Sequence, residues 1–315
     1  NAAVRIYAMK VLYELKDAEI LVTGIAGQIG SRFAEILGQE GISYRGIDIL
    51  DINPSYPYLK YNLSDRADID RLRCFIKPAT HVIHLASRMS NESNIEKGVS
   101  ENFNINVLST VNLLNALSRE TKHLAFASTM TVYGIPDQLP VRETSHTQPD
   151  NLYAATKLMT EKYLSVFSKK NSLPIAVLRY SSVYGPGRIT DRAIPRIIEN
   201  VIDGCSPLIK GSGSTVRDYI YIDDVVYATL VSSAKHASSI INIGTGVGTS
   251  LKQLAEKIIE LSQKSVELRF DLESQDGHSI YYDISKMKNE LEYVPCVTLS
   301  DGLATEISWH KLRRM

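Results

Sequence analysis

The chain has 315 residues, enough to bury one large α/β core or two modest ones. Its 35 basic and 35 acidic side chains cancel, so no overall charge draws the protein to nucleic acid or to an anionic membrane. No apolar run approaches the ~20 residues that span a bilayer, and Cys74, Cys205 and Cys296 lack both metal-ligand spacing and the density of a disulfide scaffold. We therefore expect a cytoplasmic protein without a metal site, and we assign no function to residues 1–17.

Short apolar runs alternate with amphipathic stretches from about residue 19 to residue 180. The runs predict strands at 19–23, 43–48, 81–85, 124–128 and 175–180, and the stretches between them predict helices that include 28–37 and 106–117. Strands and helices that alternate in this way form a parallel sheet with crossover helices on its faces. The predicted fold class is therefore α/β, with a doubly wound parallel sheet.

The pattern changes after residue 180. We expect a helix near 195–203, a glycine-serine turn at 211–214, a strand at 240–243, a helix at 250–261 and a mixed tail from 266 to 315. These elements predict a main domain at 18–180, to which 217–262 partly returns. They also predict a smaller, discontinuous C-terminal domain made of 181–216 and 263–315.

A glycine pattern follows the first predicted strand directly. The strand continues through Thr23-Gly24-Ile25-Ala26-Gly27-Gln28-Ile29-Gly30 into an amphipathic helix. Gly24 permits a tight turn, Gly27 lets backbone N–H groups approach a pyrophosphate, and Gly30 lets the helix pack on the sheet. The start of the helix adds partial positive charge. A glycine triplet alone also fits a flexible turn, but between a strand and a helix it predicts a Rossmann-type dinucleotide site.

The second strand ends at Asp48. A carboxylate at this place accepts hydrogen bonds from the ribose hydroxyls of adenosine and repels a 2′-phosphate, which favours NAD over NADP. Neither Ile49 nor Leu50 adds the positive charge that a 2′-phosphate would need. Asp51 is an alternative carboxylate, and a solvated acid at a strand end is the alternative without function. We predict NAD as the cofactor.

Tyr153 and Lys157 are four residues apart, so on a helix they share one face. A phenol has a reference pKa of about 10, and a nearby ammonium together with the positive nicotinamide ring is expected to lower it. Tyr153 then exchanges a proton with a substrate hydroxyl while hydride moves. Thr129, at the end of the strand 124–128, is expected to donate a hydrogen bond to the same substrate oxygen. The pair by itself also occurs by chance on surface helices.

The chain resembles the extended short-chain dehydrogenase/reductase family, which includes the NAD-dependent epimerases and dehydratases. The resemblance covers roughly residues 19 to 310 and rests on collinear motifs: residues 23–30, 84–86, 106–107, 113–114, 129–134, 179–180, 183–186, 211–224 and 242–246, with the pair Tyr153 and Lys157. It implies a Rossmann domain that holds NAD and a C-terminal domain that binds substrate, usually a nucleotide-diphosphate sugar. It also implies a homodimer formed by helices near 102–117 and 151–169.

The resemblance implies a set of site residues. The cofactor-binding residues are Gly24, Gly27, Gln28, Ile29, Gly30, Asp48, Asn62, Leu63, Leu85, Ala86, Ser87, Asn106, Tyr153, Lys157 and Tyr180, with Lys157 on the nicotinamide ribose. The substrate-binding residues are Thr129, Ser182 and Arg217, where the guanidinium of Arg217 suits a diphosphate. Two alternatives are structural: Asn106 caps the helix 106–117, and Arg217 pairs with Asp218 or Asp223. His84 is interpreted as a packed structural histidine.

Three positions depart from the family pattern. Asn62 stands where the family often has an aspartate at the adenine, and Ser182 stands where many members have an asparagine at the substrate phosphate. The arginine that often completes the diphosphate clamp aligns with Glu273, and Arg269 is the nearest arginine in sequence. These departures weaken the nucleotide-sugar assignment and leave the NAD assignment untouched.

The residues after Thr129 bear on the reaction type. Family dehydratases usually carry acids there, because the elimination of water needs an acid and a base besides the tyrosine. Here the positions hold Met130 and Thr131, so a dehydratase is not expected. We predict an epimerase that acts at C4 of a nucleotide-linked sugar through a transient keto intermediate. A 4-ketoreductase, an NAD-dependent sugar dehydrogenase and a non-catalytic NAD-sensing regulator are the alternatives.

Overall fold

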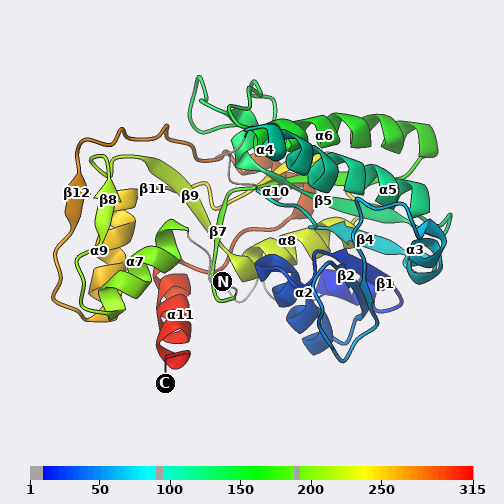
Figure 1. The fold of residues 1–315 in the computed structure, drawn as a ribbon, viewed down its shortest axis with the longest axis horizontal. Helices are drawn as coiled ribbons and strands as arrows, with labels where there is room; N and C mark the ends of the chain where they lie inside the picture. Colours follow the sequence, from blue (N-terminus) through cyan, green and yellow to red (C-terminus); the bar gives the residue numbers. More distant parts are fainter. Residues whose placement is uncertain (1–9, 90–94, 188–191, 315) are drawn as a thin grey trace.

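The computed structural model describes residues 10–89, 95–187 and 192–314, and within these ranges a seven-stranded parallel sheet forms the centre of the protein. The strand order is β10-β6-β5-β4-β1-β2-β3 (Figure 1). The strands are Glu19–Thr23 (β1), Ser43–Asp48 (β2), Tyr58–Lys60 (β3), His81–His84 (β4), His123–Thr129 (β5), Ile175–Tyr180 (β6) and Ile240–Ile243 (β10). The predicted doubly wound sheet is confirmed.

Two halves of this sheet diverge from β1, which pairs with β2 on one side and with β4 on the other. Loops that leave the carboxyl ends of the two halves separate at this point and leave room for a ligand. Strands β4 and β6 are buried along their whole length, as expected when helices cover both faces of a parallel sheet. The fold therefore places a ligand site where the glycine motif follows β1.

Helices cover both faces of the sheet. One face carries Gln28–Gln39 (α2), Ile222–Ala234 (α8) and Ser285–Leu291 (α10), together with the short 3₁₀ turn Tyr13–Leu15 (η1). The other face carries Ile69–Ile76 (α3), Ser109–Ala116 (α5) and Leu152–Asn171 (α6). Leu12 and Leu15 are buried in the apolar core between the sheet and the face that carries α2, α8 and α10. The described part of residues 1–17 therefore has a packing role.

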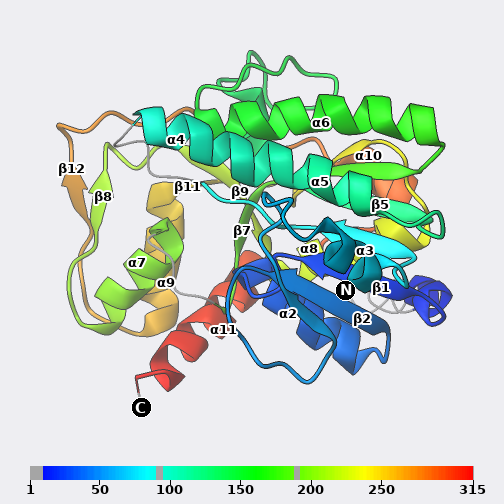
Figure 2. The same ribbon diagram turned by 45° about the vertical axis from the view of Figure 1, so that its right-hand side comes forward.

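The helix predicted at 106–117 begins earlier and is not uniform. It consists of Ile95–Asn102 (α4), the π-helical segment Phe103–Leu108 (η2) and α5, and Figure 2 shows this long helix beside α6. The predicted start at Asn106 is therefore wrong. A π-helical segment bonds i→i+5 and shifts the register of a 3.6-residue pattern, and such segments are frequent at functional sites.

A smaller group of elements lies beside the sheet (Figure 1). It contains the strands Ser182–Tyr184 (β7), Val216–Tyr221 (β9) and Gly248–Ser250 (β11), the pair Leu208–Lys210 (β8) and Arg269–Asp271 (β12), and the helices Ala193–Ile202 (α7), Leu251–Ser262 (α9) and Leu299–Leu312 (α11). The third apolar core includes side chains from all three helices. Of the segment 217–262, α8 and β10 join the large sheet, whereas α9 packs in the smaller group. The division into domains stays a prediction.

Among the described helices, none is both long enough and apolar enough to cross a membrane.

Candidate active site

The glycine turn after β1 has little room for any side chain. Gly24 has a φ of +72°, and a Cβ there would lie 2.8 Å from the backbone nitrogen of Ala86. A Cβ at Gly30 would collide with the carbonyl oxygen of Gly24. Gly27 caps α2 without a side-chain hydrogen bond, and the first turn of α2 holds no acidic residue. The first N–H groups of α2 are thus left for an external anion, which fits the pyrophosphate of a dinucleotide.

Asp48 lies against this turn. Its Oδ2 accepts a hydrogen bond from the amide of Ala26 at 2.9 Å, and its Oδ1 accepts from the amide of Ile49 at 2.8 Å. Asp51 instead forms an exposed ion pair with Lys60 at 2.7 Å. Since only the Asp48 carboxylate contacts the glycine loop, it is the better of the two candidates for the ribose hydroxyls.

The end of β4 borders the same turn. The amide of Ala86 donates to the hydroxyl of Thr23 at 3.2 Å, which brings Leu85, Ala86 and Ser87 beside the glycine motif. His84 is buried between Thr23 and Thr110, with its two ring nitrogens 2.7 and 2.9 Å from their hydroxyls. Burial lowers the pKa of His84 to about 3, so the ring is neutral, and its predicted structural role is confirmed.

Asn62 and Leu63 follow β3. Asn62 is exposed, and its Oδ1 accepts hydrogen bonds from the amide and the hydroxyl of Ser64, at 3.1 and 2.7 Å. Leu63 is buried, and its carbonyl oxygen accepts a hydrogen bond of 2.8 Å from Asn112. The Asn62 oxygen that was expected to face adenine already has two donors, so an adenine contact by this oxygen stays a prediction.

Asn106 does not cap a helix. It lies inside η2, and its buried side chain bonds to the backbone of Arg88 in both directions, accepting from N–H at 3.0 Å and donating to C=O at 3.1 Å. It also donates to the hydroxyl of Thr156 at 3.1 Å. The amide therefore ties the segment after β4 to α6, which explains its place near the site better than the capping role does.

Tyr153 and Lys157 lie on α6, which begins after Asn151. The Asn151 side chain accepts a hydrogen bond from the amide of Ala154 at 2.9 Å and caps the helix. Tyr153 is half-buried in the first turn, and Lys157 is buried one turn later. The Lys157 ammonium lies 4.3 Å from the ring centre of Phe126 and 5.9 Å from that of Tyr153. The predicted pair thus shares one face of the helix.

The charges around this pair differ from the sequence-based expectation. Burial lowers the pKa of Lys157 to about 7, against the opposing effect of Glu161. Burial raises the pKa of Tyr153, while a hydrogen bond to Ser87 and the charge of Arg192 act in the lowering direction. The lowering of the Tyr153 pKa expected from Lys157 together with the nicotinamide ring stays a prediction, and Lys157 is itself desolvated.

A buried ion pair supports this face of α6, and the sequence analysis missed it. Arg179 binds Glu161 through two hydrogen bonds of 3.0 and 2.6 Å, and Ser128 donates to the same carboxylate at 2.5 Å. Both charged side chains are at most 2% exposed. Glu161 stands four residues after Lys157, and this spacing is the one signal that places it on the inner face.

Thr129 ends β5 and caps the 3₁₀ turn Met130–Tyr133 (η3). Its hydroxyl oxygen accepts a hydrogen bond from the amide of Thr131 at 3.3 Å, and the two threonine hydroxyls are 3.1 Å apart. The hydroxyl of Ser182, on β7, lies 3.6 Å from the sulfur of Met130. Thr129 and Ser182 therefore lie at neighbouring positions, although they are far apart in sequence.

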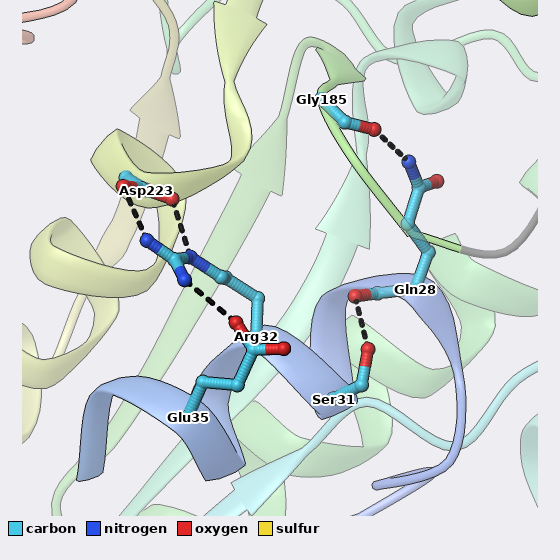
Figure 3. Close-up of polar contacts among 6 residues, drawn as sticks. All are labelled: Gln28, Ser31, Arg32, Glu35, Gly185 and Asp223. Carbon is cyan, nitrogen blue, oxygen red and sulfur yellow. Dashed lines mark hydrogen bonds and ion pairs between the residues drawn. The ribbon is translucent and has the colours of Figure 1, made fainter. Parts of the chain in front are cut away.

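Arg217 has no acidic partner among the described residues. Asp218 accepts hydrogen bonds from Thr245 and Gly246, and Asp223 pairs with Arg32 at 2.6 Å (Figure 3). Arg217 donates instead to the carbonyl oxygens of Val216, at 3.2 Å, and His278. Burial lowers the pKa of its guanidinium. The structural alternative for Arg217 is wrong, and the half-buried cation is open to an anionic ligand.

Tyr180 and the two C-terminal candidates contribute less. The Tyr180 hydroxyl is buried and lies 2.8 Å from that of Thr229 on α8, so a role in cofactor binding falls to its backbone. Glu273 follows β12 and is exposed, as is Arg269. No described contact joins Glu273 or Arg269 to Arg217.

The family model of the NAD dependent epimerase/dehydratase family matches residues 20–244. A putative UDP-glucose 4-epimerase of Methanocaldococcus jannaschii is 31% identical over 309 residues, covering 93% of this chain and 98% of that protein. The UDP-glucose 4-epimerase of Thermotoga maritima, solved with UDP-glucose, has a TM-score of 0.87 at 29% identity and covers 94% of this chain and 100% of that one. The UDP-glucose 4-epimerase of Thermus thermophilus, solved with NAD, has a TM-score of 0.82 at 28% identity, with 93% and 99% covered.

Proposed function

Because this chain belongs to the NAD dependent epimerase/dehydratase family, we propose that it epimerises a nucleotide-diphosphate sugar at C4 and retains one NAD through each turnover. The observation that carries the proposal is the position of Tyr153 and Lys157 on one face of α6, joined through Thr156 and Asn106 to the segment that borders the glycine turn. This arrangement supports a proton-transfer role for Tyr153 at the proposed dinucleotide site.

The chain's own residues supply the proton chemistry. When bound, NAD would supply reversible hydride transfer at C4. Tyr153 takes the proton of the C4 hydroxyl at its phenolic oxygen and returns it to the same oxygen after the keto sugar has turned its other face toward the cofactor, with Ser87 and Arg192 favouring the phenolate. Thr129 accepts from the Thr131 amide, and when the Thr131 hydroxyl is the donor in the 3.1 Å contact between the two hydroxyls, the Thr129 hydrogen can be donated to the reacting oxygen. Lys157 holds the ribose hydroxyls.

Arg217 supports a diphosphate-linked substrate. A half-buried guanidinium without an acidic partner is costly to maintain unless an anion neutralises it, and its planar donors suit a phosphate. Ser182 adds a hydroxyl near Thr129. The buried Met130 at the position of a dehydratase acid supports epimerisation over dehydration.

The test begins with protein purified without added cofactor. We expect denaturation to release NAD, identified by mass spectrometry, and incubation with UDP-glucose or UDP-glucuronate to give a product inverted at one carbon without added dinucleotide. An empty site and a strict need for added NADPH would replace this reading with a 4-ketoreductase. Stoichiometric NADH from added NAD would indicate a sugar dehydrogenase, and bound NAD without turnover would favour a regulator.

We also propose that two copies of the chain pair through α4, η2 and α6. Val99 and Phe103 are 46% and 44% exposed, and on α6 the side chains of Met159, Tyr163 and Val166 are 46 to 55% exposed. Their spacing puts them in one stripe on each helix, and the two helices lie side by side (Figure 2). Light scattering of the wild-type protein should give twice the mass of one chain. Val166→Glu should lower the measured mass toward that of one chain. A wild-type protein with the mass of a single chain would refute the dimer.

A further inference from the structure

The first residue of α2 contacts a segment of the chain more than a hundred residues away. The side-chain amide of Gln28 donates a hydrogen bond of 2.8 Å to the carbonyl oxygen of Gly185 (Figure 3). A Cβ at Gly187 would lie 2.8 Å from the Cγ of Gln28. Gln28 therefore lies against both glycines of the segment 185–187, which directly follows β7 and Ser182 on the substrate side.

The segment 185–187 is held tightly on its other side. Gly185 and Gly187 have φ values of +140° and +147°, a region that other residues rarely adopt. A Cβ at Gly185 would lie 2.6 Å from the Cγ2 of Ile222, at the start of α8. The amide of Gly185 also hydrogen-bonds to the carboxyl group of Glu306 on α11. The segment is thus anchored to α8 and α11, and Gln28 joins it to α2.

A second contact joins α2 to the start of α8. Arg32, one turn after Gln28, binds Asp223 through two hydrogen bonds of 2.6 and 2.8 Å, and it also binds Glu35 at 2.6 Å (Figure 3). Asp223 is the neighbour of Ile222, which packs on Gly185. The first turn of α2 is therefore joined to the segment 185–187, and the next turn is joined to the start of α8, on which that segment packs.

We propose that the Gln28 to Gly185 hydrogen bond is a clasp that slows the release of the dinucleotide, so that Gln28 is a positioning residue for cofactor retention. The N-cap residue of this helical turn, Gly27, offers no side-chain hydrogen bond, so the first backbone N–H groups of α2 are suited to the pyrophosphate. The clasp closes the substrate-side segment against this turn. The inference rests on the proposed function, in which one NAD stays bound through successive turnovers.

The experiment measures dinucleotide release. Protein loaded with NADH is mixed with excess NAD, and the loss of bound-NADH fluorescence gives the release rate. Gln28→Met keeps the length of the side chain and removes the donor, and we expect release to become roughly 3- to 10-fold faster, as for one lost hydrogen bond.

Two further variants separate the clasp from local effects. Ser31→Ala removes the hydrogen bond from the Ser31 hydroxyl to the Gln28 carbonyl oxygen without touching Gly185, and its release rate should match the wild type. Gln28→Glu keeps the shape but removes the donor and adds a charge that also repels the pyrophosphate, so its fast release counts only together with that of Gln28→Met. If Gln28→Met fails to fold, Gln28→Leu, which lacks the donor and adds no charge, carries the test.

The outcomes distinguish this proposal from the proposed function. Equal release rates in wild type, Gln28→Met and Gln28→Glu would overturn the clasp even if the protein epimerises its sugar. Faster release in both Gln28 variants would support the clasp even if no sugar is turned over. A wild-type protein that binds no dinucleotide would overturn both.

Discussion

The ammonium of Lys157 lies 4.3 Å from the ring centre of Phe126 on β5, and burial at this place lowers its pKa to about 7. A cation over an aromatic face gains some attraction, but it loses the hydration that an exposed lysine keeps. The proposed active site therefore contains a group that lowers the stability of the fold. Residues of this kind are retained for function, since stability alone would favour an apolar side chain.

We predict that Lys157→Met makes the protein without dinucleotide more stable and abolishes turnover. The ammonium of Lys157 loses its proton more easily in the folded chain than in the unfolded chain, where the lysine pKa is 10.5. The loss of folding stability caused by burying this charge is therefore complete below pH 7 and disappears as the pH rises to 10.5. Denaturant unfolding should show a gain of about 3 to 5 kcal/mol at pH 7 and about 1 kcal/mol at pH 9.5. A gain that does not change with pH would contradict this reading.

Tyr153→Phe should reduce kcat by about 10³-fold, because it removes the group that moves the substrate proton. The NAD content of the purified protein should not change, since the phenolic oxygen is the only atom lost. Tyr163→Phe is the matched control on the same helix, where the side chain is 46% exposed, and it should leave kcat unchanged. A Tyr153→Phe enzyme with near-normal kcat would remove the tyrosine from the mechanism.

Arg217→Met should raise the KM for the nucleotide sugar by roughly 10- to 100-fold with a small effect on kcat, because a charge-assisted contact to the diphosphate is lost. Arg71→Met, on the exposed surface of α3, is the control and should leave both constants unchanged. Steady-state kinetics, with the sugar product separated and quantified, checks the prediction. An unchanged KM would place the diphosphate elsewhere.

Glu306→Gln should stabilise the protein at alkaline pH. Burial raises the pKa of this carboxyl from 4.5 to about 7, and its Oε2 has no partner among the described residues. The loss of folding stability caused by ionising this buried carboxyl is complete above pH 7 and disappears as the pH falls to 4.5. We expect the variant to gain about 1 to 3 kcal/mol at pH 8 and less than about 1 kcal/mol at pH 5. Glu273→Gln, at an exposed position, serves as the control variant.

Two buried histidines should make the fold sensitive to acid. Burial lowers the pKa of His81 to about 4 and that of His123 to about 3, so both are neutral in the folded protein. In the unfolded chain both histidines bind a proton below pH 6.5. Folding stability is therefore lost as the pH falls from 6.5 toward the folded-state pKa values of His81 and His123. Each should cost about 2 kcal/mol at pH 5 relative to pH 7. Unfolding of a His81→Gln/His123→Gln variant should show a weaker pH slope, unlike the exposed control His146→Gln.

Local chemistry explains why some elements could be predicted. The glycine turn and the start of α2 could be predicted because the Gly27 amide donates to the Gly24 carbonyl oxygen and Gly30 packs against Gly24, both within residues 23–30. The contact of Gly24 with Ala86 comes from a distant part of the chain. The alternation of apolar strands and helices likewise reports burial on both faces of a sheet. By contrast, the start of the helix that contains Asn106 was predicted wrongly, since a π-helical segment precedes α5 and shifts the helical register away from a 3.6-residue pattern.

Charge states and distant pairings could not be read from residue spacing. The four-residue spacing of Tyr153 and Lys157 predicted a shared face and not the desolvation that lowers the pKa of Lys157. Arg217 stood beside two acids in the sequence, and the fold gave both of them other partners. The cytoplasmic location and the domain boundaries stay predictions.

The sequence by itself determined the α/β class and the dinucleotide turn, and it predicted Tyr153 and Lys157 as the proton-transfer residues, because each depends on the order of residue types along a short stretch of chain. The tertiary structure decided which of those side chains are charged, which are already bonded and which face a ligand. It joined Gln28 to Gly185 and Glu161 to Arg179, and it left Arg217 without an acid among the described residues. The physical reason is that desolvation and pairing depend on every group within a few ångströms, and most of those groups come from distant parts of the chain.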